Sequence, residues 1–287
     1  MEAAELIKKV RKIEIKTRGL SRQIFAGEYQ SVFKGRGMAF SEVREYQYGD
    51  DIRNIDWNVT ARFDRPYVKV FEEERELTVM LLVDISGSGD FGTQEKFKRT
   101  LMAELAAVLS FSAIQNNDKV GVILFSDRVE KFIPPKKGRQ HILRVIRELI
   151  DYEASSRATD VSAALKYFTN AINKRCTAFL ISDLISPPFE ESLRIASRKH
   201  DVMALRILDS REASLPPLGL MKMRDAESGR EMWVDTSSRA VQRAYAEWWV
   251  GLQSRIDATL MRCGVDAAMI RTGEDYVKPL MKLFKLR

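Results

Sequence analysis

Short, almost continuously apolar segments alternate with longer amphipathic ones from residue 77 onward. The apolar segments are TVMLLVDIS (78–86), KVGVILFSD (119–127), CTAFLISDL (176–184), DVMALRILD (201–209) and DAAMIRT (266–272). Runs of this length that end in polar residues are typical of strands buried on both faces of a parallel sheet. Between them, helical periodicity predicts helices near 94–115, 138–152, 161–173, 188–199, 237–261 and 275–286.

This alternation predicts an α/β fold with a doubly wound, mostly parallel sheet in the strand order 3-2-1-4-5-6. Two segments depart from it. VEKFIPP (129–135) is expected to be a short edge strand that Pro134 and Pro135 stop. Residues 210–236 are expected to be an insertion that contains a β-hairpin, because Ser228-Gly229 lies between MKMRDA and EMWVD as a turn.

The helix near 237–261 carries two adjacent tryptophans. A stripe at helical spacing joins Val241, Tyr245, Trp248, Leu252 and Ile256. Trp248 is therefore expected to be buried against the sheet and Trp249 to be less buried.

Residues 1–76 follow another pattern. Apolar residues at helical spacing predict a basic amphipathic helix from Ala3 to Thr17, and alternation predicts a strand over Pro66–Phe71. Between them, Asp50 or Asp51 can cap a short helix whose apolar residues are expected in a core: Ile52, Ile55 and Trp57. The chain thus divides into a helix with a small, partly β attachment (1–76) and a large domain (77–287).

Composition limits the function classes. The chain has 287 residues, 45% of them apolar, and a net charge of +7, of which 9 − 4 = +5 lies in residues 1–36. Two cysteines and two histidines leave little room for disulfide, zinc or haem chemistry. No apolar run approaches the about 20 residues of a membrane span. We expect a cytoplasmic protein, and scarce aromatic residues among the N-terminal basic ones argue against nucleic-acid binding.

Oxygen-bearing side chains follow the predicted strands. Asp84, Ser86 and Ser88 end the first strand, and Asp183 ends CTAFLISDL, which is expected to lie next to it. The loop Ala158-Thr159-Asp160 can add the Thr159 hydroxyl. Hard cations prefer such ligands. The sequence therefore predicts a Mg²⁺ or Mn²⁺ site of Asp84, Ser86, Ser88, Thr159 and Asp183, although Thr159 or Asp160 can also cap a helix and the serines can satisfy a turn.

Signatures of common enzymes are missing. The sequence has no GxxxxGK[ST] loop and no GxGxxG after a strand, and neither histidine lies in a catalytic motif. Asp90 and Asp160 are the evident spare carboxylates for a general base, and no recognised motif positions them.

DISGS, ATD and ISD on a doubly wound sheet resemble the von Willebrand factor A domain with its metal-ion-dependent adhesion site. REYQYGDDIRNIDWNVTAR (44–62) and VKVFEEERE (68–76) resemble the narrower bacterial "domain of unknown function fifty-eight" family, from about Val32 onward. This resemblance implies a non-catalytic, chaperone-like binding module that works with a MoxR-type AAA+ ATPase or a shared client protein. It also implies that an acidic partner residue completes the metal shell. A metal-dependent phosphohydrolase remains the alternative.

Overall fold

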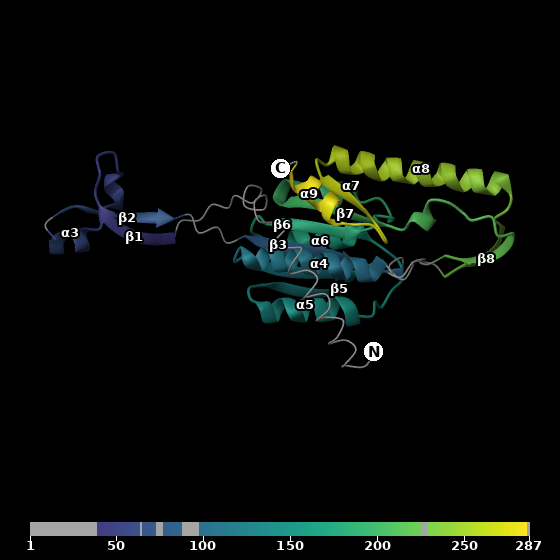
Figure 1. The fold of residues 1–287 in the computed structure, drawn as a ribbon, viewed down its shortest axis with the longest axis horizontal. Coiled ribbons are helices and arrows are strands. Elements are labelled where there is room, and N and C mark those ends of the chain that lie inside the picture. The colour runs from purple at the N-terminus through teal and green to yellow at the C-terminus, as the bar shows by residue number, and fades with distance from the viewer. Residues whose placement is uncertain (1–38, 64, 73–76, 88–97, 226–228, 286–287) are drawn as a thin grey trace. The chain divides into compact units, whose positions relative to one another are not determined.

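The computed structural model of the chain describes residues 39–63, 65–72, 77–87, 98–225 and 229–285 (Figure 1). They belong to two compact units, a small one over Phe33–Leu77 and a large one that begins at Thr78. The predicted helix at Ala3–Thr17 lies outside the described residues. None of the helices in these described ranges is both long and apolar enough to cross a bilayer.

The large unit is built on a six-stranded sheet. Its order is β10 (Asp266–Arg271), β7 (Asp201–Leu208), β6 (Thr177–Ser182), β3 (Thr78–Asp84), β4 (Lys119–Phe125) and β5 (Val129–Lys136). All neighbours run parallel except β5, which is antiparallel to β4. The chain winds outward from β3 in both directions, so the predicted doubly wound order is confirmed.

Helices cover both faces of this sheet. They are α4 (Lys98–Gln115), α5 (Arg139–Asp151), α6 (Val161–Ala171), α7 (Glu190–Lys199), α8 (Arg239–Arg262) and α9 (Val277–Lys285). The crossovers β3–α4–β4 and β6–α7–β7 step in opposite directions across the sheet. Because such crossovers are right-handed, α4 and α7 lie on opposite faces.

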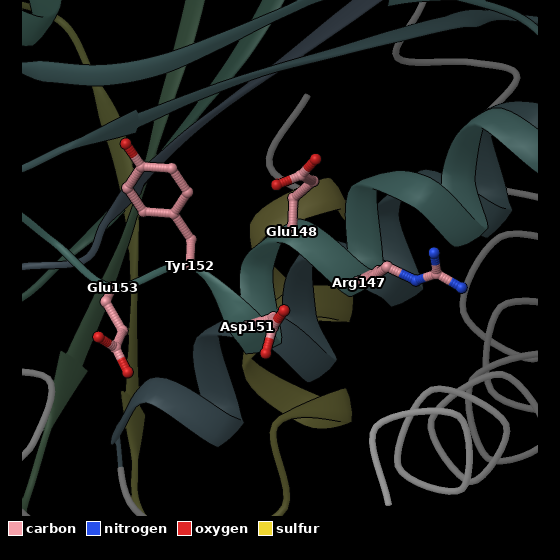
Figure 2. A pocket seen from close by; sticks show the side chains of 5 residues that line it. All are labelled: Arg147, Glu148, Asp151, Tyr152 and Glu153. Atoms are coloured by element: carbon pink, nitrogen blue, oxygen red, sulfur yellow. The ribbon is translucent and has the colours of Figure 1, made fainter. Parts of the chain in front are cut away.

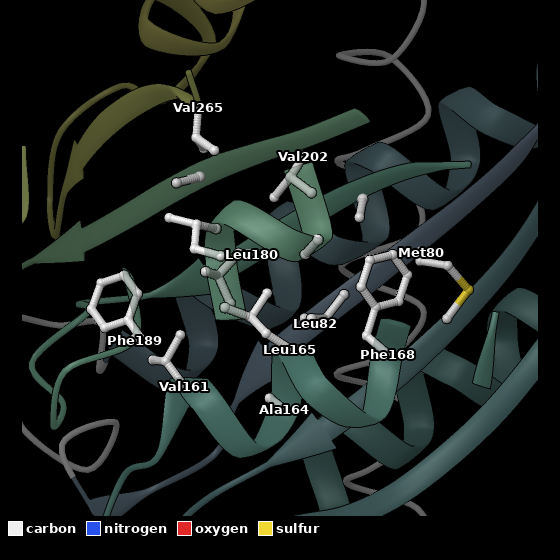
Figure 3. Close-up of a cluster of buried hydrophobic side chains, with 14 of the residues drawn as sticks. Met80, Leu82, Val161, Ala164, Leu165, Phe168, Leu180, Phe189, Val202 and Val265 are labelled. Atoms are coloured by element: carbon white, nitrogen blue, oxygen red, sulfur yellow. The ribbon is translucent and has the colours of Figure 1, made fainter. Parts of the chain in front are cut away.

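The core on the α7 face joins strands β3, β4, β6 and β7 to helices α6, α7 and α8 (Figure 3). Leu82, Leu180 and Leu165 are each at most 1% exposed within it. On the other face, the Phe179 ring meets Phe284 of α9 edge to face, with centroids 6.1 Å apart. Helix α4 is buried almost all round, which is typical of a helix in the middle of a layer.

Strand β5 corrects one expectation. It continues through Pro134 and Pro135 to Lys136 instead of stopping at the prolines. The strand lies at the edge of the sheet, where the missing N–H groups of proline leave no interior hydrogen bond unmade. A register shift between Val120 and Val122 accommodates the second half of the strand.

The expected hairpin insertion is present. Strands β8 (Leu220–Arg224) and β9 (Glu231–Asp235) pair antiparallel, and Thr236 ties their base to Gly219 through its hydroxyl. Leu220, Met232 and Trp233 are exposed on it. Because β7 leads into this insertion, the hairpin is attached at the carboxyl edge of the parallel strands.

The small unit pairs β1 (Ala39–Glu45) with β2 (Tyr67–Glu72), and β1 was not predicted. A 3-10 helix (Ile52–Asn54) and α3 (Trp57–Phe63) connect them, and Asp51 caps the first as expected. The prediction that Ile52, Ile55 and Trp57 form a core is wrong for two of the three. Ile52 and Trp57 are 66% and 68% exposed, and Ile55 is half-buried. A two-stranded unit this small has too little inside to cover them.

Helix α8 reverses the expected burial of its tryptophans. Trp249 is 9% exposed and Trp248 is 49% exposed. The buried stripe runs through Trp249, Ile256 and Leu260, so its phase differs by one residue from the predicted stripe at this point. Trp248 instead lies beside the stripe, its ring 5.5 Å from Tyr245.

Trp249→Ala should therefore destabilise the chain by about 2 kcal/mol more than Trp248→Ala, because only the first removes a buried ring. Urea titrations of the two variants against the wild type measure the difference. Equal losses would mean that α8 does not bury the Trp249 side.

Candidate functional site

The two predicted metal-binding carboxylates lie at the carboxyl edges of neighbouring strands. Asp84 is the last residue of β3, and Asp183 directly follows β6, which pairs with β3 in parallel. Their residues are 2% and 1% exposed. The sequence prediction that these strands are neighbours and bring the carboxylates to one edge is confirmed.

Local hydrogen bonds orient Asp84. Its Oδ1 accepts from the Ser86 backbone N–H at 2.9 Å, and its Oδ2 accepts from the Ser182 hydroxyl at 2.7 Å. Burial, and next the nearby Asp183 carboxylate, raise the pKa of Asp84 to about 7. The protein thus holds a carboxylate in surroundings that disfavour its charge.

Backbone hydrogen bonds join the loop that contains Thr159 to the loops that follow β3 and β4. The Gly87 N–H donates to the Arg157 carbonyl and the Asp160 N–H donates to the Ser126 carbonyl, each at 2.9 Å. Thr159 lies between these two anchor points and is 3% exposed. Its hydroxyl has no hydrogen-bond partner among the described residues. A buried hydroxyl without a partner is costly, so this group fits a ligand that the described part of the chain does not supply.

The other predicted groups have different outcomes. Ser86 is buried beside Asp84. Ser88 and the spare carboxylate Asp90 lie outside the described residues. Asp160 caps α6, accepting from the Ala163 N–H at 3.0 Å. This bond supports the capping interpretation of Asp160.

Asp183 is held by a lysine that the sequence analysis missed. Its Oδ1 accepts from the Ile185 N–H and its Oδ2 from the Lys98 ammonium, both at 3.1 Å. Lys98 is fully buried and also pairs with Glu212. Burial alone would lower the pKa of Lys98, but the two carboxylates outweigh it and raise the pKa, so the ammonium stays charged. The backbone after Asp183 is strained, because Leu184 has φ 62°.

A second buried cation lies nearby on β7. Arg206 is 1% exposed and pairs with Asp257 and Gln253 of α8. Burial lowers the pKa of Arg206, while the Asp257 and Asp183 carboxylates oppose that shift.

The burial of both cations could have been inferred from their positions in the sequence. Lys98 precedes Leu101 and Leu105 on the apolar stripe of α4, and Arg206 interrupts an apolar strand. A charge at such a position needs a buried partner.

A divalent cation at this edge would be held by Thr159, Ser86 and the two oriented carboxylates. The fit rests on the Thr159 hydroxyl, which no described residue hydrogen-bonds, and on this oxygen-only donor set, which suits Mg²⁺ or Mn²⁺. In the described ranges, no three His, Cys, Asp or Glu side chains gather to hold a metal. Hydroxyl oxygens would therefore have to supply part of the coordination. Because both carboxylates already accept hydrogen bonds from groups of the chain, we expect them to contact the metal through metal-bound water molecules.

A hollow of about 380 Å³ lies elsewhere, at the end of α5 (Figure 2). Arg147, Glu148, Asp151, Tyr152 and Glu153 line it. Two of these side chains are engaged, since Glu148 accepts from Lys131 at 2.6 Å and the Tyr152 hydroxyl donates to the Glu130 carbonyl. The hollow contains none of the predicted metal ligands.

The buried thiol and imidazole next to each other have no nucleophilic character. Cys176 Sγ lies 3.4 Å from His200 Nδ1, beneath the Phe168 ring. Burial, with Asp201 nearby, raises the pKa of Cys176 to about 12. Burial, and then Lys199 and Arg175, lower the pKa of His200 to about 4. The pair is therefore neutral at pH 7 and belongs to the core.

The lowered pKa of His200 predicts that the stability of the fold depends on pH. Because the pKa of His200 falls from about 6.5 unfolded to about 4 folded, protons bind the unfolded chain preferentially between these values. Folding should lose up to about 3 kcal/mol as pH falls through this window. Urea titrations from pH 7.5 to 4.5 should show that His200→Gln removes this loss. The comparison cancels Asp84, which both proteins retain. Identical pH profiles would show that His200 is not the titrating group.

The sheet order defines a doubly wound, mostly parallel α/β protein. More narrowly, the chain belongs to the family described as "Protein of unknown function DUF58", which matches residues 42–250. A relative in Mycobacterium tuberculosis, the uncharacterized protein Rv1480, is 30% identical over 284 residues. The match covers 97% of this chain and 88% of the relative.

Solved structures of similar fold include BatB from Bacteroides thetaiotaomicron, described as a conserved hypothetical protein. It is 16% identical with a TM-score of 0.48, and the match covers 73% of this chain and 98% of BatB. The SpRpn10 VWA domain is 11% identical with a TM-score of 0.39, covering 74% of this chain and 95% of that domain.

Proposed function

We propose that the chain is a metal-dependent protein-binding module that is not itself catalytic. Mg²⁺ or Mn²⁺ is held at the carboxyl edge of β3 and β6, and an acidic side chain of the partner completes its coordination. The observation that carries the proposal is the Thr159 hydroxyl, which is buried beside the loop of Asp84 and Ser86 and has no hydrogen-bond partner in the described part of the chain. A site lined by oxygen atoms suits a hard divalent cation, which prefers oxygen ligands.

The electrostatics of the site support a partner carboxylate. The two acidic side chains about balance a divalent cation, and Lys98 already neutralises part of the charge on Asp183. An incoming carboxylate therefore meets little repulsion. The family resemblance points to a MoxR-type AAA+ ATPase or a shared client as this partner, in a chaperone-like role in the cytoplasm.

The test is to mix the purified chain with a purified MoxR-type ATPase and measure association in Mg²⁺ and in EDTA. Binding should require the cation. Thr159→Val, which keeps the shape and removes the hydroxyl, should weaken Mn²⁺ binding and association at least about tenfold, or about 1.4 kcal/mol.

Ser112→Ala is the matched control, because it also removes a buried hydroxyl without a partner among the described residues, but one within α4. It should leave association unchanged. Undiminished binding in EDTA would exclude a metal bridge. Hydrolysis of a phosphoester by the chain alone, lost in Asp84→Ala, would favour the phosphohydrolase instead.

A further inference from the structure

We propose that Lys98 is a positioning residue that competes with the metal ion for Asp183, and that Glu212 sets how strongly it competes. The inference rests on the metal site of the proposed function and adds a way to regulate it from the hairpin insertion.

The Lys98 ammonium group is enclosed between two carboxylates. It lies 3.1 Å from Asp183 Oδ2, pairs with Glu212, and its residue is 0% exposed. An ammonium group has three donors, and this one is shielded from bulk solvent, so the two carboxylates divide its charge between them. A divalent cation that approaches Asp183 draws on the same negative charge. The two cations therefore weaken each other's hold on Asp183.

Glu212 connects this pair to the insertion. It ends the 3-10 helix Ser210–Glu212, where its Oε2 accepts from the Asp209 N–H at 2.9 Å. Its carbonyl accepts from the Tyr245 hydroxyl of α8 at 2.8 Å. The residue that pairs with Lys98 is thus fixed at the point where the chain leaves β7 for the hairpin.

The direction of the coupling follows from the charges. When the metal binds, Asp183 holds Lys98 less, and the ammonium turns more fully to Glu212. Conversely, loss of the Glu212 charge leaves Lys98 to Asp183 and weakens the metal. Because such coupling is reciprocal, a partner that displaces Glu212 through the hairpin should also release the cation.

The experiment measures Mn²⁺ affinity from the electron paramagnetic resonance signal of free Mn²⁺. Lys98→Met should bind Mn²⁺ about tenfold more tightly than the wild type, and Glu212→Gln about tenfold more weakly, a size usual for coupled sites. Glu231→Gln is the matched control. It makes the same chemical change in an exposed ion pair of the hairpin, with Lys222, and should change nothing.

A double variant keeps the test decisive if Lys98→Met alone does not fold. Lys98→Met/Glu212→Gln removes both members of the buried pair and should bind Mn²⁺ more tightly than the wild type, because the interaction of Glu212 with Lys98 outweighs its direct charge interaction with Asp183. Hydrogen exchange gives a second measurement. Mg²⁺ should slow exchange of the amides at 209–212 in the wild type and leave Glu212→Gln unchanged.

The inference is overturned if the Lys98 and Glu212 variants shift Mn²⁺ affinity in the same direction, as loss of a merely structural pair would, or if neither shifts it. That result leaves the metal site intact as long as Asp84→Ala abolishes Mn²⁺ binding. If the wild type binds no Mn²⁺, or Asp84→Ala binds it equally well, the metal site itself is wrong and the inference falls with it.

Discussion

Gly121→Val should destabilise the chain by on the order of 4 kcal/mol, and Gly121→Ala by about 2 kcal/mol, because strand β4 has no room for a side chain here. A Cβ atom on Gly121 would lie 2.6 Å from Met80 Sδ, 3.0 Å from the Pro135 backbone nitrogen and 3.1 Å from the Ile133 carbonyl oxygen.

Only the first of these three close contacts can be relieved by the rotation of a side chain. The Met80 side chain can turn aside, but the other two atoms belong to the backbone of β5. Moving them would break the pairing of β5 with β4, which already changes register at this point. Gly121 is thus the residue that lets an edge strand with two prolines stay on the sheet.

Gly251→Ala is the matched control in the same chain. Gly251 lies within α8, and the nearest atom to an added Cβ is Nη1 of Arg255 at 3.8 Å. The change should stabilise the helix by about 0.5–1 kcal/mol, since alanine loses less backbone entropy than glycine. Urea titration of all three variants measures the contrast. A Gly121→Ala protein as stable as the wild type would show that β5 yields to the added methyl group.

The sheet was predictable from the sequence because strands that are buried on both faces of a parallel sheet consist of apolar runs. The carboxyl end of each strand is marked by the polar residues that end the run. That is why the order of residues alone assigns Asp84 and Asp183 to one edge of the sheet. Thr159 followed from its place before a helix. In each case the signal is local, and the fold rules supply the rest.

Lys98 and Glu212 could not be paired in this way. They are more than a hundred residues apart in sequence, and Glu212 opens an insertion that no periodicity governs. The predicted burial of Trp57 and Trp248 was wrong for another reason. An apolar residue in a small unit, or at the margin of an apolar stripe, need not be buried by another element, since much of a protein's surface is apolar.

Asp84→Asn should stabilise the metal-free chain and abolish its metal binding. The amide keeps the shape of the carboxylate and can still accept from the Ser86 N–H, but it carries no charge. In the wild type, burial and the Asp183 carboxylate raise the pKa of Asp84 to about 7 from an ordinary 3.8. Ionising this group in the folded chain therefore costs on the order of 3–4 kcal/mol.

The sign of the pH dependence identifies the cause. With its pKa raised by folding, Asp84 binds a proton more readily in the folded chain than in the unfolded one. Its cost is thus fully present above pH 7, shrinks as pH falls, and is gone below about pH 4. The advantage of Asp84→Asn in EDTA should be largest at pH 8 and small at pH 5.

Urea titrations in EDTA at pH 8 and pH 5 measure the stability, and Mn²⁺ titrations of the same samples measure the affinity, which should fall at least about a hundredfold, or about 2.7 kcal/mol. Asp160→Asn is the matched control, because Asp160 caps α6 and an asparagine caps nearly as well. If Asp84→Asn proves less stable than the wild type at pH 8, the carboxylate is a structural group. If it is more stable and binds no Mn²⁺, the chain keeps a costly charge at this edge because the cation needs it.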